Sequence, residues 1–383
     1  MFADRVAQLQ RALDERAAQQ LLRTPVTLEQ YSGRVLTIAG QGYINFCGND
    51  YLGLATEPQV LQAFADGASR YGAGSSGSPL VTGQHSVHQQ LSDSLCDWLG
   101  AERVLLFSSG FAANQAMLLT LSNKNDTLLL DKLSHASLID AALHSGTAFK
   151  RFGHNDLSAL QHLLSQVKQA LVVTEGVFSM DGDSPNLKAM LSLCQQFNAP
   201  LLLDDAHGLG VLGPEGKGSA AEQGIAQHEL FCSMANFGKA LGVGGAFIAA
   251  GKTVIDYIEQ FGRHYIYSTA LPPALCAAVL KSIELCRKDD WRRDKLHSNI
   301  AQFRALASDL PLLDSQSAIQ GLVLGSSERA LSVSQALKHA GIWLSAIRPP
   351  TVPQGSARLR ITLSAQHTGQ DIQQLVQQLR QLV

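Results

Sequence analysis

The sequence predicts an α/β fold, in which a mostly parallel β-sheet carries helices on both faces and is joined to a smaller α+β domain. Three observations support this prediction. Short, continuously apolar segments such as residues 128–130 and 201–203 are typical of strands that are buried on both faces. Segments with helical periodicity separate these strands, as in repeated strand–helix units. The pattern changes after about residue 275, where a long helical segment precedes short strands.

The individual elements follow from local periodicity along the chain. Residues 1–23 alternate apolar with charged or amide side chains, which predicts an amphipathic helix and not a secretory signal. Strands are predicted at 103–107, 127–130, 171–174, 200–203 and 245–249, and helices at 112–121, 137–144, 187–197, 273–306 and 371–382. We therefore expect an N-terminal helix and arm that packs with the small domain, a large domain and a small C-terminal domain, at residues 1–48, 49–275 and 276–383.

The composition indicates a cytoplasmic globular enzyme. Of the 383 residues, 45% are hydrophobic and 16% are charged, and the net charge of −2 indicates no basic surface for nucleic acid. No apolar segment approaches the roughly 20 residues that span a bilayer, so we expect no membrane partner. The six cysteines lack C-x-x-C spacing, which indicates reduced thiols and neither a metal site nor a disulfide framework.

Polar residues that directly follow predicted strands are the candidate site, because open parallel sheets bind ligands beyond the carboxyl ends of their strands. Asp204, Asp205 and His207 follow the strand at 200–203, where a carboxylate can hold a protonated ring nitrogen. A simple turn that begins at Asp205 is the alternative. His135 follows the strand at 127–130, where it can lie against a planar ligand or have a purely structural role.

Two further places complete the candidate site. Lys239 stands among glycines and small apolar residues, where burial would lower the pKa of its amine and favour Schiff-base chemistry, although most lysines are solvated. The Ser-Ser-Gly turn that ends at Gly110 precedes a predicted helix, whose free N–H groups can bind phosphate; an ordinary serine cap is the alternative. Together the four places describe a ligand with a phosphate, a planar ring, a ring nitrogen and a carbonyl. Pyridoxal 5′-phosphate (PLP) fits this description.

A rival motif lies at residues 208–213, which match G-x-G-x-x-G and follow a predicted strand. A dinucleotide-binding turn must open a helix, but here a loop of proline, glycine and charged residues follows. An NAD-dependent oxidoreductase therefore stays only as an alternative from another class. The P-loop, H-E-x-x-H and G-x-S-x-G patterns are absent from the sequence.

The chain resembles the α-oxoamine synthases, which are fold-type-I PLP-dependent transferases, nearly from end to end. The resemblance implies decarboxylative condensation of L-alanine with a pimeloyl thioester, on CoA or acyl carrier protein, to give 8-amino-7-oxononanoate and CO2 in biotin biosynthesis. Glycine C-acetyltransferase is the sibling alternative, and a PLP-fold protein without catalysis is a third. The matching blocks lie at residues 49–54, 109–114, 133–138, 174–183, 204–208, 237–239, 267–269 and 346–353, the last of which points to the biotin branch.

The resemblance also implies roles for single residues. Lys239 would hold PLP as a Schiff base and then remove the substrate's Cα proton, and Asp204 would pair with the pyridine nitrogen. His207 would contact the ring hydroxyl, and His135 would stack on the ring. Further cofactor contacts are implied for Gly110, Phe111 and Ser179, contacts from the neighbouring subunit of a homodimer for Ser268 and Thr269, and substrate contacts for Arg23, Asn49, Arg348 and Thr351.

Two positions depart from the family pattern. Asn236 stands where the family usually has a Thr or Ser whose hydroxyl contacts the phosphate, and its amide can donate a hydrogen bond there with altered geometry. Pro79 stands where some relatives have Gly or Arg, within the glycine-rich stretch at 72–83, which we expect to be a loop.

Overall fold

The computed structural model describes residues 2–383, which form two compact units. The larger unit comprises residues 49–179 and 183–296, and the smaller unit comprises residues up to Gly48, 180–182 and from His297 onward. The break after Gly48 lies where the sequence places it. The second break follows Leu296 and so differs from the expected position, residue 276, which lies inside helix α11 (Pro273–Lys288). This helix packs against α2 (Pro58–Tyr71) and α3 (Ser86–Leu99) of the larger unit.

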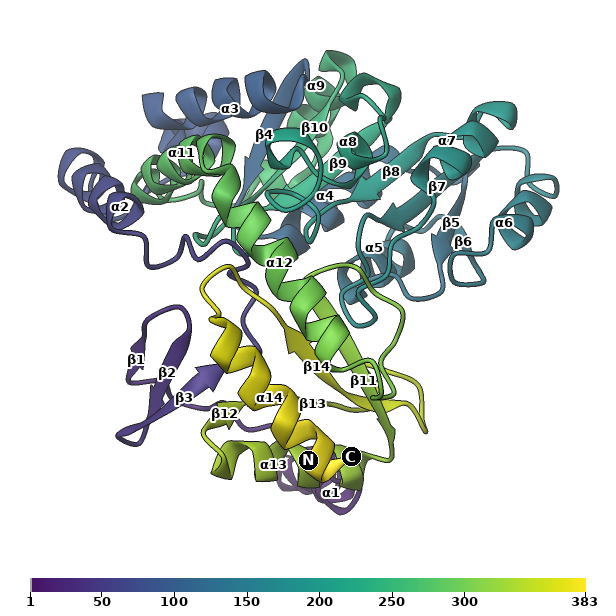
Figure 1. Cartoon of the computed structure of the whole chain (residues 1–383). Helices are drawn as coiled ribbons and strands as arrows, with labels where there is room; N and C mark the ends of the chain where they lie inside the picture. Colours follow the sequence, from purple (N-terminus) through teal and green to yellow (C-terminus); the bar gives the residue numbers. More distant parts are fainter. Residues whose placement is uncertain (1) are drawn as a thin grey trace. The chain divides into compact units, whose positions relative to one another are not determined.

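The larger unit is built on a seven-stranded sheet with the strand order β4-β10-β9-β8-β7-β5-β6 (Figure 1). Strands β5 to β9 pair in parallel with their neighbours, whereas β10 is antiparallel to both β4 and β9. The predicted mostly parallel sheet is therefore confirmed. The strands are β4 (Arg103–Phe107), β5 (Thr127–Asp131), β6 (Ala148–Phe152), β7 (Ala170–Glu175), β8 (Leu201–Asp204), β9 (Cys232–Asn236) and β10 (Ala246–Ala250).

Helices cover both faces of this sheet (Figure 1), which explains the runs of three leucines in β5 and β8. Successive side chains of a strand point to opposite faces. In β5, Leu128 and Leu130 therefore pack with one group of helices, whereas Leu129 packs with the other. The first group contains α4 (Gly110–Leu121), α5 (Ala136–His144), α9 (Lys252–Phe261) and α10 (Arg263–Ile266), and the second contains α6 (Leu157–Leu164), α7 (Leu187–Gln196) and α8 (Ser219–Glu222).

Two segments that the sequence predicted have a different form in the structure. The single helix expected at 273–306 is interrupted at Asp289, whose backbone is not helical (φ −94°, ψ 65°) and whose carboxylate accepts a hydrogen bond from Arg292 at 3.2 Å. A second helix, α12 (Asp290–Leu306), begins at the next residue. In the glycine-rich stretch at 72–83, residues Pro79–Gly83 form one π-helical turn instead of a loop.

The smaller unit contains two small sheets and three complete helices of its own in the described chain. The expected N-terminal amphipathic helix is present as α1 (Phe2–Ala18), and none of its residues is buried. No helix within residues 2–383 is long and apolar enough to cross a membrane. One sheet is formed by β1 (Gln30–Tyr31), β2 (Val35–Ile38), β3 (Gln41–Asn45) and β12 (Ile342–Trp343), the other by β11 (Ile319–Gly325), β14 (Ala357–Thr362) and β13 (Ala346–Ile347), with helices α13 (Ser327–His339) and α14 (Gly369–Leu382).

Candidate active site

Lys239 lies in the turn between β9 and β10 and is half-buried. The turn is tight, because the Gly242 N–H donates to the Lys239 carbonyl at 2.9 Å. Gly242 has a φ of +66°, and a Cβ there would lie 2.3 Å from the backbone nitrogen of Ala55. Glycine is therefore required for the turn to pack against the segment after Leu54. The positive charge of Lys239 acts on the pKa values of His135 and Glu175, so the three groups lie near one another.

Asp204 is the last residue of β8 and is almost fully buried. Its Oδ1 accepts a hydrogen bond from the Ala206 N–H at 3.0 Å, and its Oδ2 accepts one from Nδ2 of Asn114 at 2.7 Å. Its backbone pairs with Glu175 of β7 on one side and Met234 of β9 on the other. The carboxylate is thus held at the carboxyl ends of three adjacent parallel strands, where ligands of such sheets bind.

Asp205 has a structural role, which was the alternative interpretation of this position. Its carboxylate accepts hydrogen bonds from the backbone N–H and hydroxyl of Ser219 at 2.8 and 2.5 Å. Burial raises the pKa of Asp205 to about 7, although the hydrogen bonds from Ser219 oppose this increase. A Cβ at Gly208 or at Gly218 would lie 2.2 or 2.0 Å from a carboxylate oxygen of Asp205. The chain then continues into a 3-10 turn at Pro214–Gly216, so the G-x-G-x-x-G motif opens no dinucleotide-binding helix.

His207 is buried beside Asp204, and its Nδ1 lies 2.8 Å from the hydroxyl of Tyr51. The same hydroxyl lies 3.2 Å from Oδ1 of Asn49, so it connects two residues that the sequence singled out. Tyr51 itself is fully buried, and sequence reasoning assigned it no role. A tyrosine that is buried usually has a hydrogen-bond partner, but the sequence does not reveal which one.

His135 is the N-cap of α5 at the end of the loop after β5. Although the residue as a whole is exposed, partial burial of the ring lowers its pKa, against the opposing charge of Asp204. The His135 N–H donates to Oε1 of Glu175 at 2.5 Å. Burial, together with the negative charge of Asp204, raises the pKa of Glu175 well above its usual value. Glu175 therefore holds the backbone of the loop at His135, a function that the sequence did not suggest.

The N-terminus of α4 presents the backbone of Gly110 and Phe111 beside the end of β9. Ser109 caps the helix by accepting a hydrogen bond from the Ala112 N–H at 3.2 Å. A Cβ at Gly110 would lie 3.7 Å from Nδ2 of Asn236, while Oδ1 of that side chain accepts from the Gly238 N–H at 3.1 Å. The Asn236 amide therefore turns its donor toward the helix terminus, which is a favourable place for an anion.

Three other predicted cofactor residues lie in loops of the larger unit. Ser179 is half-buried after β7, just before the short segment that belongs to the smaller unit. Ser268 and Thr269 follow α10. Ser268 lines a surface cavity of about 390 Å³ together with Tyr267, Phe261 and residues from the C-terminal half of α4, on a part of that helix away from its N-terminus.

The predicted substrate residues Arg23, Arg348 and Thr351 belong to the smaller unit, whereas Asn49 belongs to the larger one. Arg23 donates to Oγ1 of Thr351 at 2.8 Å. Arg348 donates to the backbone carbonyl of Gln20 and, at 3.5 Å, to that of Leu22. The structure thus brings together three side chains from opposite ends of the chain.

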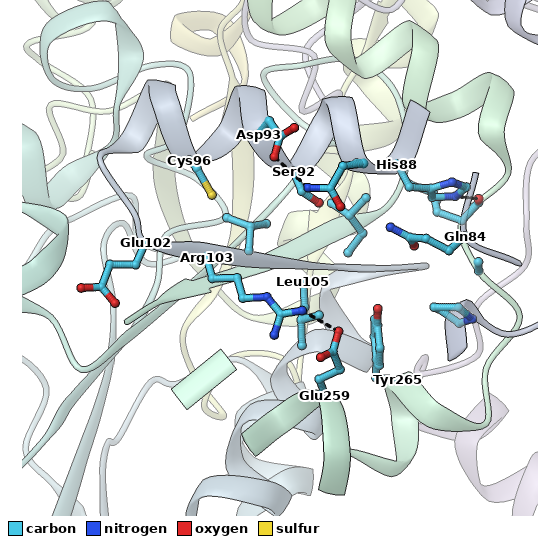
Figure 2. A pocket seen from close by; sticks show the side chains of 16 residues that line it. Gln84, His88, Ser92, Asp93, Cys96, Glu102, Arg103, Leu105, Glu259 and Tyr265 are labelled. Carbon is cyan, nitrogen blue, oxygen red and sulfur yellow. Dashed lines mark hydrogen bonds and ion pairs between the residues drawn. The ribbon is translucent and has the colours of Figure 1, made fainter. Parts of the chain in front are cut away.

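Another cavity in the larger unit, of about 170 Å³, contains none of the predicted residues (Figure 2). It lies between α3, β4 and the α9–α10 region, and an ion pair of Arg103 with Glu259 at 2.8 Å crosses one side. His88 at its other end is buried, with its Nε2 bonded to the Leu271 carbonyl at 2.7 Å. These side chains are already paired, so we place the candidate site at the sheet edge instead.

The fold and the group of polar residues at its strand ends define a PLP-dependent enzyme of the aminotransferase type. The model of the family "Aminotransferase class I and II" matches residues 41–379, and the chain belongs to this family. Among its relatives are the 8-amino-7-oxononanoate synthases of Photobacterium profundum and Vibrio cholerae. The first is 48% identical over 98% of this chain and 96% of its own length, and the second is 47% identical over 98% and 97%. The predicted resemblance is therefore confirmed.

Solved structures give the same result. Serine palmitoyltransferase from S. paucimobilis with a bound PLP–myriocin aldimine superposes with a TM-score of 0.91 at 29% identity, covering 100% of this chain and 97% of that one. The 8-amino-7-oxononanoate synthase from Francisella tularensis superposes with a TM-score of 0.79 at 31% identity, covering 88% of this chain and 97% of that one. The fold-type-I architecture predicted from the sequence is confirmed by these neighbours.

Proposed function

We propose that this protein uses PLP to condense L-alanine with a pimeloyl thioester, releasing CO2 and the free thiol and giving 8-amino-7-oxononanoate. The observation that carries this proposal is the near end-to-end similarity to synthases of that name, combined with the placement of Lys239, Asp204 and His207 at adjacent strand ends. The name of the relatives supports the substrates, and the strand-end groups support the cofactor.

The residues present fit PLP. The N-terminus of α4, with no side chain at Gly110 and with the Asn236 amide beside it, suits the phosphate. The buried carboxylate of Asp204 suits a protonated pyridine nitrogen, because an adjacent negative charge favours the protonated form. Lys239 supplies the amine that binds the aldehyde. When bound, the cofactor supplies an electron sink for a carbanion at the substrate's Cα.

The chain's own residues then orient the substrate and move its protons. Lys239 removes the Cα proton of alanine and returns one to the product. Asp204 keeps the ring nitrogen protonated, while Tyr51 orients His207, which contacts the ring hydroxyl. His135 covers the ring face and limits access of water. In the smaller unit, the Arg23–Thr351 pair and Arg348 offer donors for the carboxylate and acyl parts of the substrates.

We also propose a homodimer located in the cytoplasm, in which Ser268 and Thr269 serve the partner's site. Large apolar side chains that stay exposed in the single chain support an interface, including Phe111 at 46%, Phe261 at 61% and Tyr267 at 71% exposure. Ser268 lies next to two of them. The six cysteines are free, which suits a reducing compartment.

An activity assay across acyl donors tests the proposal. The purified protein should be yellow, its visible band should change on borohydride treatment, and it should release CoA faster with L-alanine and pimeloyl-CoA than with glycine and acetyl-CoA. Lys239→Ala should lose turnover by several orders of magnitude. Faster release with the glycine pair would make the protein a glycine C-acetyltransferase, and a colourless protein that binds NAD would overturn the PLP proposal altogether.

A further inference from the structure

Asn114 lies at the centre of a buried chain of hydrogen bonds that joins two groups of the proposed cofactor site. It lies in α4 and is 1% exposed. Its Nδ2 is 2.7 Å from Oδ2 of Asp204 and 2.9 Å from Oγ of Ser137. The same hydroxyl of Ser137 lies 2.8 Å from Nδ1 of His135. Side chains from β8, α4 and α5 are thus connected in series.

The direction of each bond in this chain follows from the chemistry of its first member. A carboxylate only accepts hydrogen bonds, so the Asn114 amide must turn its NH2 group toward Asp204. The second hydrogen of that NH2 group points to Ser137, whose oxygen accepts it. The Ser137 hydroxyl hydrogen is then available for Nδ1 of His135, and the Ser137 backbone N–H also donates to Nδ1 at 3.2 Å. Nδ1 is therefore an acceptor, and the ring proton of His135 must be on Nε2.

The carbonyl oxygen of the Asn114 side chain indicates that packing alone does not explain how this amide is oriented. Its Oδ1 is buried and has no hydrogen-bond partner within residues 2–383. A buried polar atom without a partner is unfavourable, so such atoms are rare in folded proteins. The orientation that leaves Oδ1 unpaired is the one that directs both amide hydrogens to Asp204 and Ser137.

We propose that Asn114 is a positioning residue that fixes the Asp204 carboxylate and, through Ser137, holds His135 in its neutral Nε2–H tautomer. The two groups expected on the edge and the face of the cofactor ring would then share one rigid frame, with His135 presenting an N–H donor. This inference rests on the proposed function, because it assigns Asp204 and His135 to the cofactor.

Two substitutions at Asn114 separate positioning from packing. Asn114→Asp preserves shape but places a second carboxyl group against Asp204, so the two share a proton and the charge offered to the ring is weakened. Asn114→Ala only removes the donor. We expect kcat to fall about tenfold in Asn114→Ala and about a hundredfold in Asn114→Asp, with KM little changed and with a shifted visible cofactor band in Asn114→Asp. Gln115→Ala, which removes a neighbouring buried amide from the same helix, should change kcat less than either.

If Asn114 only fills space, the order reverses, because aspartate fits better than alanine; that order would overturn the proposal. Ser137→Ala should lower kcat without moving the visible band, and Ser137→Thr, which keeps the hydroxyl, should restore kcat. These variants keep the test decisive even if Asn114→Asp fails to fold.

The tautomer is tested without reference to activity. The wild-type protein with 15N-labelled histidine, compared with His135→Gln to assign the signal, should show a neutral ring protonated at Nε2. A proton on Nδ1 would refute the bond directions. A wild-type protein that binds no PLP would defeat the proposed function itself, whereas a normal holoenzyme with unaffected Asn114 variants would defeat this inference alone.

Discussion

Replacement of His154 by glutamine should destabilise the larger unit in a pH-dependent way. His154 lies between two carboxylates, with Nδ1 at 2.9 Å from the fully buried Asp131 and Nε2 at 2.7 Å from Asp183. Burial by itself would lower the pKa of His154, but the hydrogen bonds and charges of the two aspartates raise it to about 10. Asp131 also accepts a hydrogen bond from the Leu133 N–H at 2.8 Å, so this cluster supports the loop that leads to His135.

The size of the effect follows from the pKa of His154. A rise from 6.5 to about 10 corresponds to roughly 5 kcal/mol at 1.36 kcal/mol per pKa unit. Because the side chain is 23% exposed, we reduce this value to about 2–3 kcal/mol for solvent screening. The pKa is raised in the folded state, so the stabilisation is complete below pH 6.5 and is lost as the pH rises through about 10.

Urea denaturation of the wild type and His154→Gln at pH 6 and at pH 10.5 measures this difference. The free energy of unfolding should differ by about 2–3 kcal/mol at pH 6 and by much less at pH 10.5. His162→Gln, at an exposed histidine of α6, is the control and should have little effect at either pH. An equal loss at both pH values would show that charge pairing is not the source and would refute the reasoning.

Three further predictions concern the candidate site. Tyr51→Phe removes the hydroxyl 2.8 Å from His207, so kcat should fall about tenfold in a steady-state assay while the fold, measured by circular dichroism, is unchanged; full activity would exclude a role for this hydrogen bond. Asn236→Ala should weaken PLP binding about tenfold in a fluorescence titration of the apoprotein, and Asn236→Thr should restore it; equal affinities would remove Asn236 from the phosphate site. Arg348→Ala should raise KM about tenfold or more for a substrate without shifting the visible cofactor band; an unchanged KM would assign Arg348 only to holding the N-terminal arm.

The candidate residues that sequence reasoning found are those next to recognisable strands. Asp204 and His207 follow a run of leucines, and Gly110 ends the Ser-Ser-Gly turn that follows β4. Local pattern is sufficient there, because the carboxyl ends of parallel strands meet at one edge. Asn114 shows the limit of this approach. Two adjacent amide side chains, Asn114 and Gln115, interrupt a mainly apolar helix and are a visible signal, but the partner of Asn114, Asp204, lies far along the chain.

The contrast between local sequence pattern and contacts of distant residues also explains where the predicted fold agrees with the structure and where it differs. Strands β4, β5, β7, β8 and β10 follow from hydrophobic runs in the sequence, which are a local property of the chain. The assignment of α11 to the larger unit depends on its packing against α2 and α3. β9 carries no strong strand signal in the sequence Cys-Ser-Met-Ala-Asn and forms because β8 and β10 pair with it on either side.

The sequence by itself determined the class of fold, the positions of the strand-end residues and the likeness to PLP enzymes. These depend on short-range pattern and on residue identity, which the chain carries without folding. Tertiary structure alone decided that Asp205 is structural, that Tyr51 bonds to His207 and that Glu175 accepts a hydrogen bond from the His135 backbone. Such contacts join residues far apart in the chain, and their energies depend on burial, which exists only once the sheet and its helices have packed.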